Sequence, residues 1–329
     1  MNRRFFLRHI LLLVVFPVLQ FPAIAAAQAD QYPNAPIRLI VPVGAGGATD
    51  ALARTFAAGL AETMGQSVVV ENRPGAASIV GAEAAAKAKP DGYTLLFGHV
   101  GIFSLNPFLY AKLPYDPQKD FIPVSGVAET PYVLVVAPAL PVKTVDELVD
   151  YTRARQGQLN YGSVGVGSVQ QLAAEWFKSE AELNITGVQY NSPGTLKIDL
   201  AENRVQLIFD NVVAAMPMIN QGKIRPLAVT SSSRSSMLPD TPTMADSGFP
   251  DYRVTSWFGL FAIAGTEQTI VDKLAEATAK VMIQPELQQK LEQLGAQPMI
   301  VSTADYANFI ADDTRKWADL IRSVGIKPQ

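Results

Sequence analysis

Two glycine-rich segments, residues 44–49 and 162–168, have the composition of anion-binding loops. Each follows a short apolar run and precedes a pattern that predicts an amphipathic helix. The first turn of a helix leaves backbone N–H groups without partners, and the helix dipole makes that end partly positive. Because glycine lets an anion approach the backbone closely, these loops predict two cradles for a carboxylate or phosphate. The alternative is that both are tight turns with ordinary caps. Asp50 should cap the first helix and point away from an anion, which it would repel.

Polar side chains beside these loops could add ligand specificity. His99 and Asn106 follow a predicted strand, and Gln171 follows the second loop. Tyr190 offers both a ring and a hydroxyl group. Asp210 ends another predicted strand, where it could hold water or a protonated ligand group, or remain a solvated acid. If His99 lines the site, ligand affinity should fall as the pH rises through its pKa. The predicted ligand-binding residues are Gly44, Ala45, Gly46, Gly47, Ala48, Thr49, His99, Asn106, Ser163, Gly165, Gly167, Ser168, Gln171, Tyr190 and Asp210.

The first loop also has part of a dinucleotide-binding fingerprint. Gly44 and Gly46 open a helix after a strand, and Glu71 ends the next strand, where a ribose-binding acid would lie. Thr49 stands at the position of the third glycine, and no Gly-Lys-Ser/Thr sequence of a phosphate-binding P-loop follows. The sequence therefore does not favour a nucleotide cofactor.

Composition excludes several kinds of active site. The 329 residues include no cysteine, and His99 is the one histidine beyond residue 29. This removes thiolate chemistry and disulfides, and leaves little for a histidine-based triad or a multi-histidine metal site. The formal charge of −3 becomes −6 without residues 1–29, which does not favour binding to nucleic acid or anionic lipid. We predict no catalytic residue, no metal and no cofactor.

Residues 1–29 have the order of a secretory signal peptide. Three arginines precede an apolar run, and residues 27–29 match an A-x-A site, so cleavage is predicted after Ala29. A membrane anchor is the alternative, but Pro17 and Pro22 interrupt the apolar run. The sequence therefore predicts a periplasmic protein, and it does not distinguish general export from twin-arginine export.

Apolar runs of strand length alternate with helical patterns along the rest of the chain. Leu52, Phe56, Leu60 and Met64 recur at four-residue spacing, which predicts one apolar face of a helix that ends at Gly65. Thr144 and Glu147 have the spacing of a capping box. The alternation predicts an α/β fold with parallel sheets in two units. The predicted strands are residues 37–43, 68–70, 93–97, 133–136, 159–163, 205–209 and 227–230, and an apolar segment at 254–263 precedes two C-terminal helices.

Seven motifs occur in one order along the chain. They are Pro-Val-Gly-Ala-Gly-Gly-Ala-Thr-Asp at 42–50, Glu-Asn-Arg-Pro-Gly-Ala at 71–76, Pro-Asp-Gly-Tyr-Thr-Leu-Leu at 90–96, Pro-Tyr-Asp-Pro-x-Lys-Asp-Phe at 114–121, Leu-Asn-Tyr-Gly-Ser at 159–163, Leu-Pro-Asp-x-Pro-Thr at 238–243 and Trp-Phe-Gly-Leu at 257–260. In these motifs and their spacing the chain resembles the Bug/TctC solute receptors of tripartite tricarboxylate transporters. The resemblance covers nearly all of the chain that follows the predicted signal peptide.

The resemblance implies a two-lobed periplasmic-binding-protein fold, type II-like, in which each lobe is a mainly parallel sheet flanked by helices. Residues 30–129 with 254–329 would form lobe one, residues 130–253 lobe two, and the crossings near 128–131 and 253–256 the hinge. It also implies a monomeric receptor without enzymatic activity. Such a receptor captures a small carboxylate in the cleft between its lobes and delivers it to membrane permease subunits. Closure would let both helix N-termini share the anion.

The sequence departs from the family pattern at positions expected in the cleft. These departures bear on which ligand is bound and not on the fold. Gln171 replaces a usual histidine, residues 189–194 differ from the usual Pro-Tyr-Lys-Gly, and His99 replaces a small polar residue. An exported α/β hydrolase is one alternative function, although no G-x-S-x-G nucleophile elbow is present. A ligand sensor for a membrane signalling partner is another.

Overall fold

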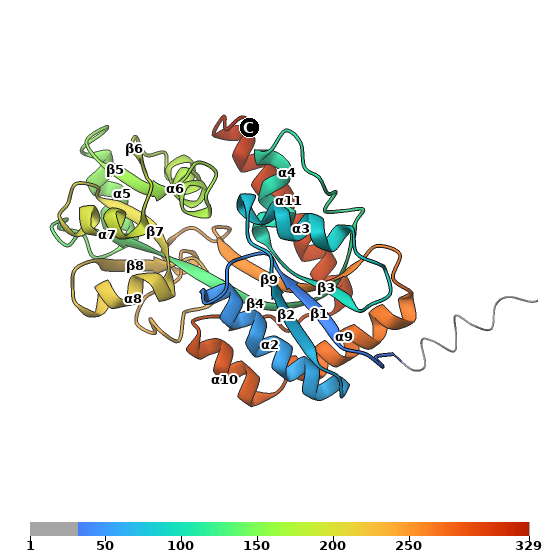
Figure 1. Ribbon diagram of the computed structural model, residues 1–329. Helices are drawn as coiled ribbons and strands as arrows, with labels where there is room; N and C mark the ends of the chain where they lie inside the picture. The colour runs from blue at the N-terminus through green and yellow to red at the C-terminus, as the bar shows by residue number, and fades with distance from the viewer. Residues whose placement is uncertain (1–31, 329) are drawn as a thin grey trace, which may run out of the picture. The chain divides into compact units, whose positions relative to one another are not determined.

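The computed structural model describes residues 32–328 (Figure 1). The predicted signal peptide, residues 1–29 with cleavage after Ala29, lies outside the described residues. Within residues 32–328, no helix combines the length and the apolar character needed to cross a membrane.

One group of strands forms a mixed sheet that we call the first sheet. Its strands are β1 (Ile37–Val41), β2 (Val68–Asn72), β3 (Thr94–His99), β4 (Phe121–Val136), β9 (Thr255–Ile263) and β10 (Gln297–Pro298). The order along the sheet is β2-β1-β3-β9-β4. β1 is parallel to β2 and β3, whereas β9 is antiparallel to β3 and β4, and the short β10 pairs antiparallel with β4.

The middle of the chain forms a second sheet. Its strands are β5 (Asn160–Val164), β6 (Thr186–Tyr190), β7 (Leu207–Asn211) and β8 (Arg225–Val229), together with the end of β4. β5 is parallel to β6 and β7, whereas β7 and β8 both pair antiparallel with β4. The carboxyl ends of β5, β6 and β7 therefore lie at one edge, which is where open α/β sheets bind ligands.

Strand β4 belongs to both sheets. Residues 121–131 pair with β9, and residues 132–136 pair with β7 and β8. We call the half built on the first sheet lobe one and the half built on the second sheet lobe two. The change of partners after Pro131 supports the predicted division into 30–129 with 254–329 and 130–253, which we keep as a proposal.

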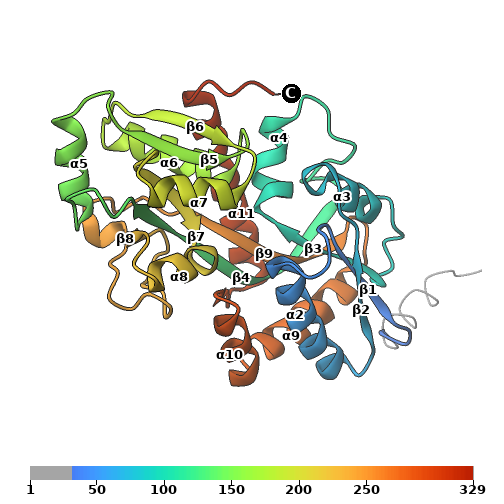
Figure 2. The same cartoon turned by 60° about the vertical axis from the view of Figure 1, so that its left-hand side comes forward.

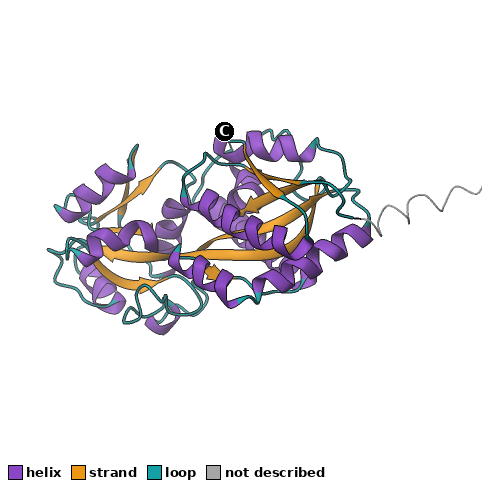
Figure 3. Cartoon of the chain, turned by 60° about the horizontal axis from the view of Figure 1, so that its bottom comes forward, coloured by secondary structure: helices purple, strands orange, loops and turns teal. Residues whose placement is uncertain are grey.

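The predicted α/β fold with two lobes is confirmed, and its sheets are more mixed than expected. Parallel pairing is found in β2-β1-β3 and β6-β5-β7. β4 and β9 carry the chain between the lobes in opposite directions, so they pair antiparallel with each other and with their neighbours. Helices flank these strands (Figure 3).

Some of the helix ends follow local signals in the sequence. They are α2 (Ala48–Met64), α3 (Ile79–Ala86), α4 (Asn106–Leu109), α5 (Val145–Arg153), α6 (Val169–Glu180), α7 (Pro193–Ala201), α8 (Val212–Asn220), α9 (Gln268–Met282), α10 (Pro285–Gln293) and α11 (Thr303–Ser323). On the predicted apolar face of α2, Leu52, Phe56 and Leu60 are fully buried and Met64 is half-buried, and Gly65 ends the helix at φ +68°. The Thr144 hydroxyl accepts the Glu147 N–H at 3.1 Å, as the capping box predicts. Among the described residues α9, α10 and α11 follow β9, so the expectation of two C-terminal helices was wrong, because Pro285 starts a new helix.

Helix α11 lies beside α6 of lobe two (Figure 2), and its Tyr306 and Phe309 rings pack against Trp257 of β9 in lobe one. Asp313, which is 6% exposed, accepts hydrogen bonds from the indole N–H groups of Trp257 at 2.7 Å and Trp317 at 3.1 Å. Lys316 pairs with the same carboxylate at 2.8 Å, and its ammonium lies 5.6 Å from the centre of the Trp176 ring in lobe two. This group of side chains joins the two lobes on the side of α11.

Candidate functional site

A cavity of about 340 Å³ lies where lobe one and lobe two meet. Lobe one contributes the turn before α3, the end of β3 and the helical segment that runs from η2 (Gly101–Leu105) into α4, and lobe two contributes the loop before α6. Ligand sites commonly have volumes of roughly 300–1,000 Å³. The polar residues of the lining are Ser78, His99, Asn106, Ser168 and Ser256, the apolar ones are Ala77, Val100, Leu105, Leu109, Tyr110, Val166 and Val169, and the glycines are Gly101 and Gly167.

The two walls of the cavity approach each other at Gly167. This glycine has φ +76°, and a Cβ atom added to it would lie 2.7 Å from the Leu109 Cδ2 atom. Leu109 ends α4 in lobe one, so a side chain at position 167 would separate the loop of lobe two from that helix. The positive φ favours glycine here, and a side chain would also force Leu109 to move.

The second predicted loop caps α6 with its own side chains. The Ser168 Oγ atom accepts the Gln171 N–H at 3.2 Å, and the Gln171 Oε1 atom accepts the Gly167 N–H at 2.7 Å. Ser168 is the N-cap of α6 and Gln171 holds the residue before it, so both side chains satisfy N–H groups at the helix start. The N–H groups of Val169 and Gln170 have no acceptor among the described residues, and they leave a partly positive helix end beside the cavity.

The first predicted loop is exposed and does not line this cavity. Residues 44–48 are exposed and Thr49 is half-buried. The Gly46 N–H donates to the Asp50 carboxylate at 2.8 Å, so that amide is already used within the loop. Asp50 also accepts from Arg54 and Asn72, and the bond from the guanidinium is the largest cause that lowers its pKa to about 2. Asp50 thus orders the loop, while the N–H groups of residues 48 and 49 have no acceptor within the described chain.

His99 and Asn106 lie in the cavity wall as neutral, hydrogen-bonded groups. Burial lowers the pKa of His99 to about 4, so its imidazole is neutral at pH 7. The prediction that ligand affinity falls as the pH rises toward neutrality required a charged His99. A histidine with this pKa is already neutral there. The Asn106 Nδ2 atom donates to the Ala77 carbonyl at 3.0 Å and to the Tyr115 hydroxyl at 3.3 Å, which holds α4 against the turn before α3.

The depressed pKa of His99 predicts a pH-dependent stability. Between pH 6.5 and about 4 the unfolded chain binds a proton at this residue that the folded chain does not bind, so the free energy of unfolding falls as the pH falls. From pH 7 to pH 4.5 this should remove about 2 kcal/mol. Urea unfolding at both pH values should show a smaller loss for His99→Gln, which cannot take up that proton. Equal losses in both proteins would contradict a neutral His99 in the folded protein.

Ser163, Gly165, Tyr190 and Asp210 do not line the cavity. Ser163 is fully buried and its Oγ atom has no hydrogen-bond partner among the described residues, and Gly165 lies exposed in the loop. The Tyr190 hydroxyl donates to Asp199 at 2.8 Å. Asp210 accepts from Gln170 at 3.2 Å and lies 3.5 Å from Lys197, and burial raises its pKa. Of the predicted site residues, the structure thus brings His99, Asn106, Gly167 and Ser168 together.

The sequence interpretation missed the turn before α3. Ala76, Ala77 and Ser78 all have positive φ, at 44°, 51° and 73°, a conformation uncommon outside glycine. The signal available in the sequence was the preceding Pro74-Gly75 pair, which marks a turn but not its direction. Ser256 was also missed, because it lies on β9 far along the chain.

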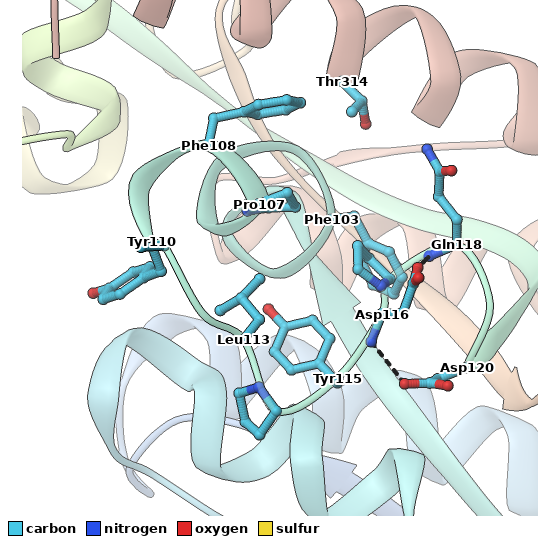
Figure 4. A pocket seen from close by; sticks show the side chains of 13 residues that line it. Phe103, Pro107, Phe108, Tyr110, Leu113, Tyr115, Asp116, Gln118, Asp120 and Thr314 are labelled. Carbon is cyan, nitrogen blue, oxygen red and sulfur yellow. Dashed lines mark hydrogen bonds between the residues drawn. The ribbon is translucent and has the colours of Figure 1, made fainter. Parts of the chain in front are cut away.

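A larger pocket of about 650 Å³ lies on lobe one between α4 and α11 (Figure 4). Its rim carries the carboxylates of Asp116 and Asp120. Backbone hydrogen bonds hold both of them, because the Asp116 N–H donates to Asp120 at 2.7 Å and the Gln118 N–H donates to Asp116 at 3.0 Å. These charges would repel an anion, so this pocket does not fit the predicted carboxylate. No group of three His, Asp or Glu side chains that could hold a metal ion occurs among residues 32–328.

Known proteins resemble the chain over most of its length. The R. palustris protein Rpa4515, solved with adipate, is 38% identical with a TM-score of 0.75, and the match covers 91% of this chain and 100% of that one. The periplasmic binding protein BugD is 31% identical with a TM-score of 0.71 over 91% and 100%. MatC (Rpa3494) from Rhodopseudomonas palustris, with bound malate, is 32% identical with a TM-score of 0.69 over 88% and 100%.

The resemblance drawn from the seven motifs is confirmed by a family match. The sequence model described as the tripartite tricarboxylate transporter family receptor, TctC, matches residues 52–326. That span includes most of lobe one and all of lobe two. The chain therefore belongs to the TctC family of receptors of tripartite tricarboxylate transporters.

Proposed function

We propose that the protein is a periplasmic receptor that binds a small carboxylate in the cavity between its lobes and delivers it to a membrane permease. The observation that carries this proposal is the cavity at the start of α6, where the N–H groups of Val169 and Gln170 have no acceptor in the described part of the chain. Its lining contains no Asp or Glu side chain to repel an anion. The solved relatives with adipate and malate support a small carboxylate as the ligand class.

The ligand would meet residues of both lobes. His99 and Asn106 present neutral polar groups from lobe one, and Gly167 and Ser168 belong to the loop of lobe two. We keep residues 44–49 as a further proposed contact, although they do not line the cavity, because the N–H groups of residues 48 and 49 at the start of α2 have no acceptor within residues 32–328. Ser163, Gly165, Gln171, Tyr190 and Asp210 would shape lobe two around the ligand, since most of their polar groups are already bonded within the protein.

Export, partner and oligomeric state complete the proposal. The signal-peptide pattern of residues 1–29 supports export to the periplasm. Membership of a transporter receptor family supports delivery to permease subunits. A monomer suffices, because both walls of the cavity come from one chain. The receptor needs no chemistry on the ligand, so we expect no turnover.

A thermal-shift panel tests this function. Adipate, malate and citrate are compared with adipamide, the neutral diamide of adipate. At least one carboxylate should raise the melting temperature in a concentration-dependent way, since a ligand at 100 times its Kd adds about 2.7 kcal/mol of stability. Adipamide should leave the melting temperature unchanged. Stabilisation by no acid, or conversion of any bound acid to a product, would contradict the receptor function.

A further inference from the structure

The hydrogen bonds of His99 fix where its proton lies. The Gly101 N–H donates to the Nδ1 atom at 3.1 Å, so Nδ1 is an acceptor. A neutral imidazole then carries its proton on Nε2. That atom lies 3.0 Å from the Ser78 Oγ atom, and we assign the imidazole as the donor and Ser78 as the acceptor.

This assignment leaves the Ser78 hydroxyl with a proton to donate. A serine hydroxyl has one donor and two acceptor positions, and His99 occupies one acceptor position. With His99 as the donor, no group within residues 32–328 accepts a hydrogen bond from the Ser78 hydroxyl. Ser78 is 8% exposed and lines the cavity between the lobes. An acceptor in that cavity would therefore complete its hydrogen bonding.

The backbone holds Ser78 in the cavity wall at an energetic cost. Ala76, Ala77 and Ser78 have consecutive positive φ values, a conformation that costs non-glycine residues on the order of 1–3 kcal/mol each. The bond from Asn106 to the Ala77 carbonyl and the bond from His99 to Ser78 secure this turn from neighbouring elements. Residues with such backbone strain persist where the surrounding structure holds them in place, and they cluster at ligand-binding and active sites.

The other residues of the cavity lining indicate the polarity of the ligand between its charged groups. Among the described residues that form it, none is Lys, Arg, Asp or Glu, and neutral His99 adds no charge. Leu105, Leu109, Val166 and Val169 supply apolar surface. A ligand with charge along its whole length would lose its water here without compensation, whereas an aliphatic body would not.

We propose that Ser78 donates a hydrogen bond to a carboxylate oxygen of the ligand, that His99 is the residue that positions Ser78, and that the ligand is a carboxylate with an apolar body. This inference rests on the proposed receptor function and names its ligand class. Adipate, with four methylene groups between its carboxylates, represents the class, and malate, with a hydroxyl group on a two-carbon spacer, lies outside it.

The test is calorimetric titration of the full-length mature protein with adipate and malate. Wild type should bind adipate at least tenfold more tightly than malate. Ser78→Ala and Ser78→Gly should each weaken adipate binding about tenfold, and the glycine variant suits φ +73°, so a folding defect would not explain its loss. Ser125→Ala, which removes a buried hydroxyl bonded to the Gly126 carbonyl outside the cavity, should keep wild-type affinity.

The positioning role of His99 has its own readout. His99→Gln retains a donor for Ser78 and should bind adipate within about threefold of wild type, whereas His99→Leu should lose as much affinity as Ser78→Gly. Equal adipate affinity in wild type and Ser78→Gly would overturn the assignment of Ser78. Tight malate or citrate binding without adipate binding would overturn the ligand class and leave the receptor function intact. Binding of no carboxylate would instead contradict the receptor function itself.

Discussion

Replacement of Gly167 by valine is expected to weaken carboxylate binding at least tenfold while the protein remains folded. Gly167 has φ +76°, and a Cβ atom there would lie 2.7 Å from Leu109 on the opposite wall of the cavity. The two methyl groups of valine extend further, so the loop before α6 would be held away from α4. Each tenfold loss in affinity corresponds to about 1.4 kcal/mol, which the separation of two packed walls readily exceeds.

A second glycine provides the matched control for this variant. Gly222 has φ +66°, and a Cβ atom added to it would meet nothing within 4 Å. Gly222→Val therefore carries a similar backbone strain without a contact in the cavity. Both variants should melt below wild type, and Gly167→Val alone should lose ligand affinity in calorimetric titration. Wild-type affinity in Gly167→Val would show that the ligand does not need the two walls to meet.

Replacement of Asp313 by alanine is expected to cause the largest loss of stability, about 3–5 kcal/mol. The variant leaves the indole N–H groups of Trp257 and Trp317 without their acceptor, and it leaves the Lys316 ammonium without its carboxylate. Buried donors without partners cost roughly 1–3 kcal/mol each, and more when charged. For a chain of this size the melting temperature should fall by about 10 °C.

Asp319 on the same helix is the control for Asp313. Its carboxylate is 65% exposed and pairs with Arg322 at 2.8 Å, three residues further along α11. An exposed pair of this kind contributes at most about 1 kcal/mol. Asp319→Ala should therefore unfold at nearly the wild-type urea concentration. If the two alanine variants were equally stable, the group of side chains around Asp313 would not hold α11 in place.

The elements that the sequence predicts well depend on local signals. The face of α2 formed by Leu52, Phe56 and Leu60, the end of that helix at Gly65 and the capping box at Thr144 all follow from residues a few positions apart. The antiparallel crossing of β4 and β9 could not be predicted in this way. It joins residues 130 and 256, which are distant in the chain, and periodicity does not report strand direction.

Only the parts of the candidate site that have local sequence signals could be predicted. Glycine composition identified the loop that contains Gly167, and the position of His99 after a strand identified the opposite wall. Ser78 was not predicted because nothing in the neighbouring sequence indicates three consecutive positive φ values. Hydrogen bonds from Asn106 and His99, which are distant in the chain, hold that turn in place. Sequence could not show that Asp50 binds the Gly46 amide, since both residues belong equally to a cap or a cradle.

Calorimetric titration with adipate and its neutral diamide tests the central claim most directly, that a carboxylate binds in the cavity between the lobes by accepting hydrogen bonds. The two molecules share their length and aliphatic body and both can accept hydrogen bonds, but only the acid carries negative charge, which makes its hydrogen bonds about twice as strong. The N–H groups at the start of α6 that have no acceptor among the described residues, together with the Ser78 hydroxyl, should therefore bind the acid much more strongly than the diamide. We predict saturable one-to-one binding of adipate by wild type, at least tenfold weaker binding by Gly167→Val, and no heat from adipamide. Equal binding of the acid and the diamide, or adipate binding that Gly167→Val leaves unchanged, would contradict the claim.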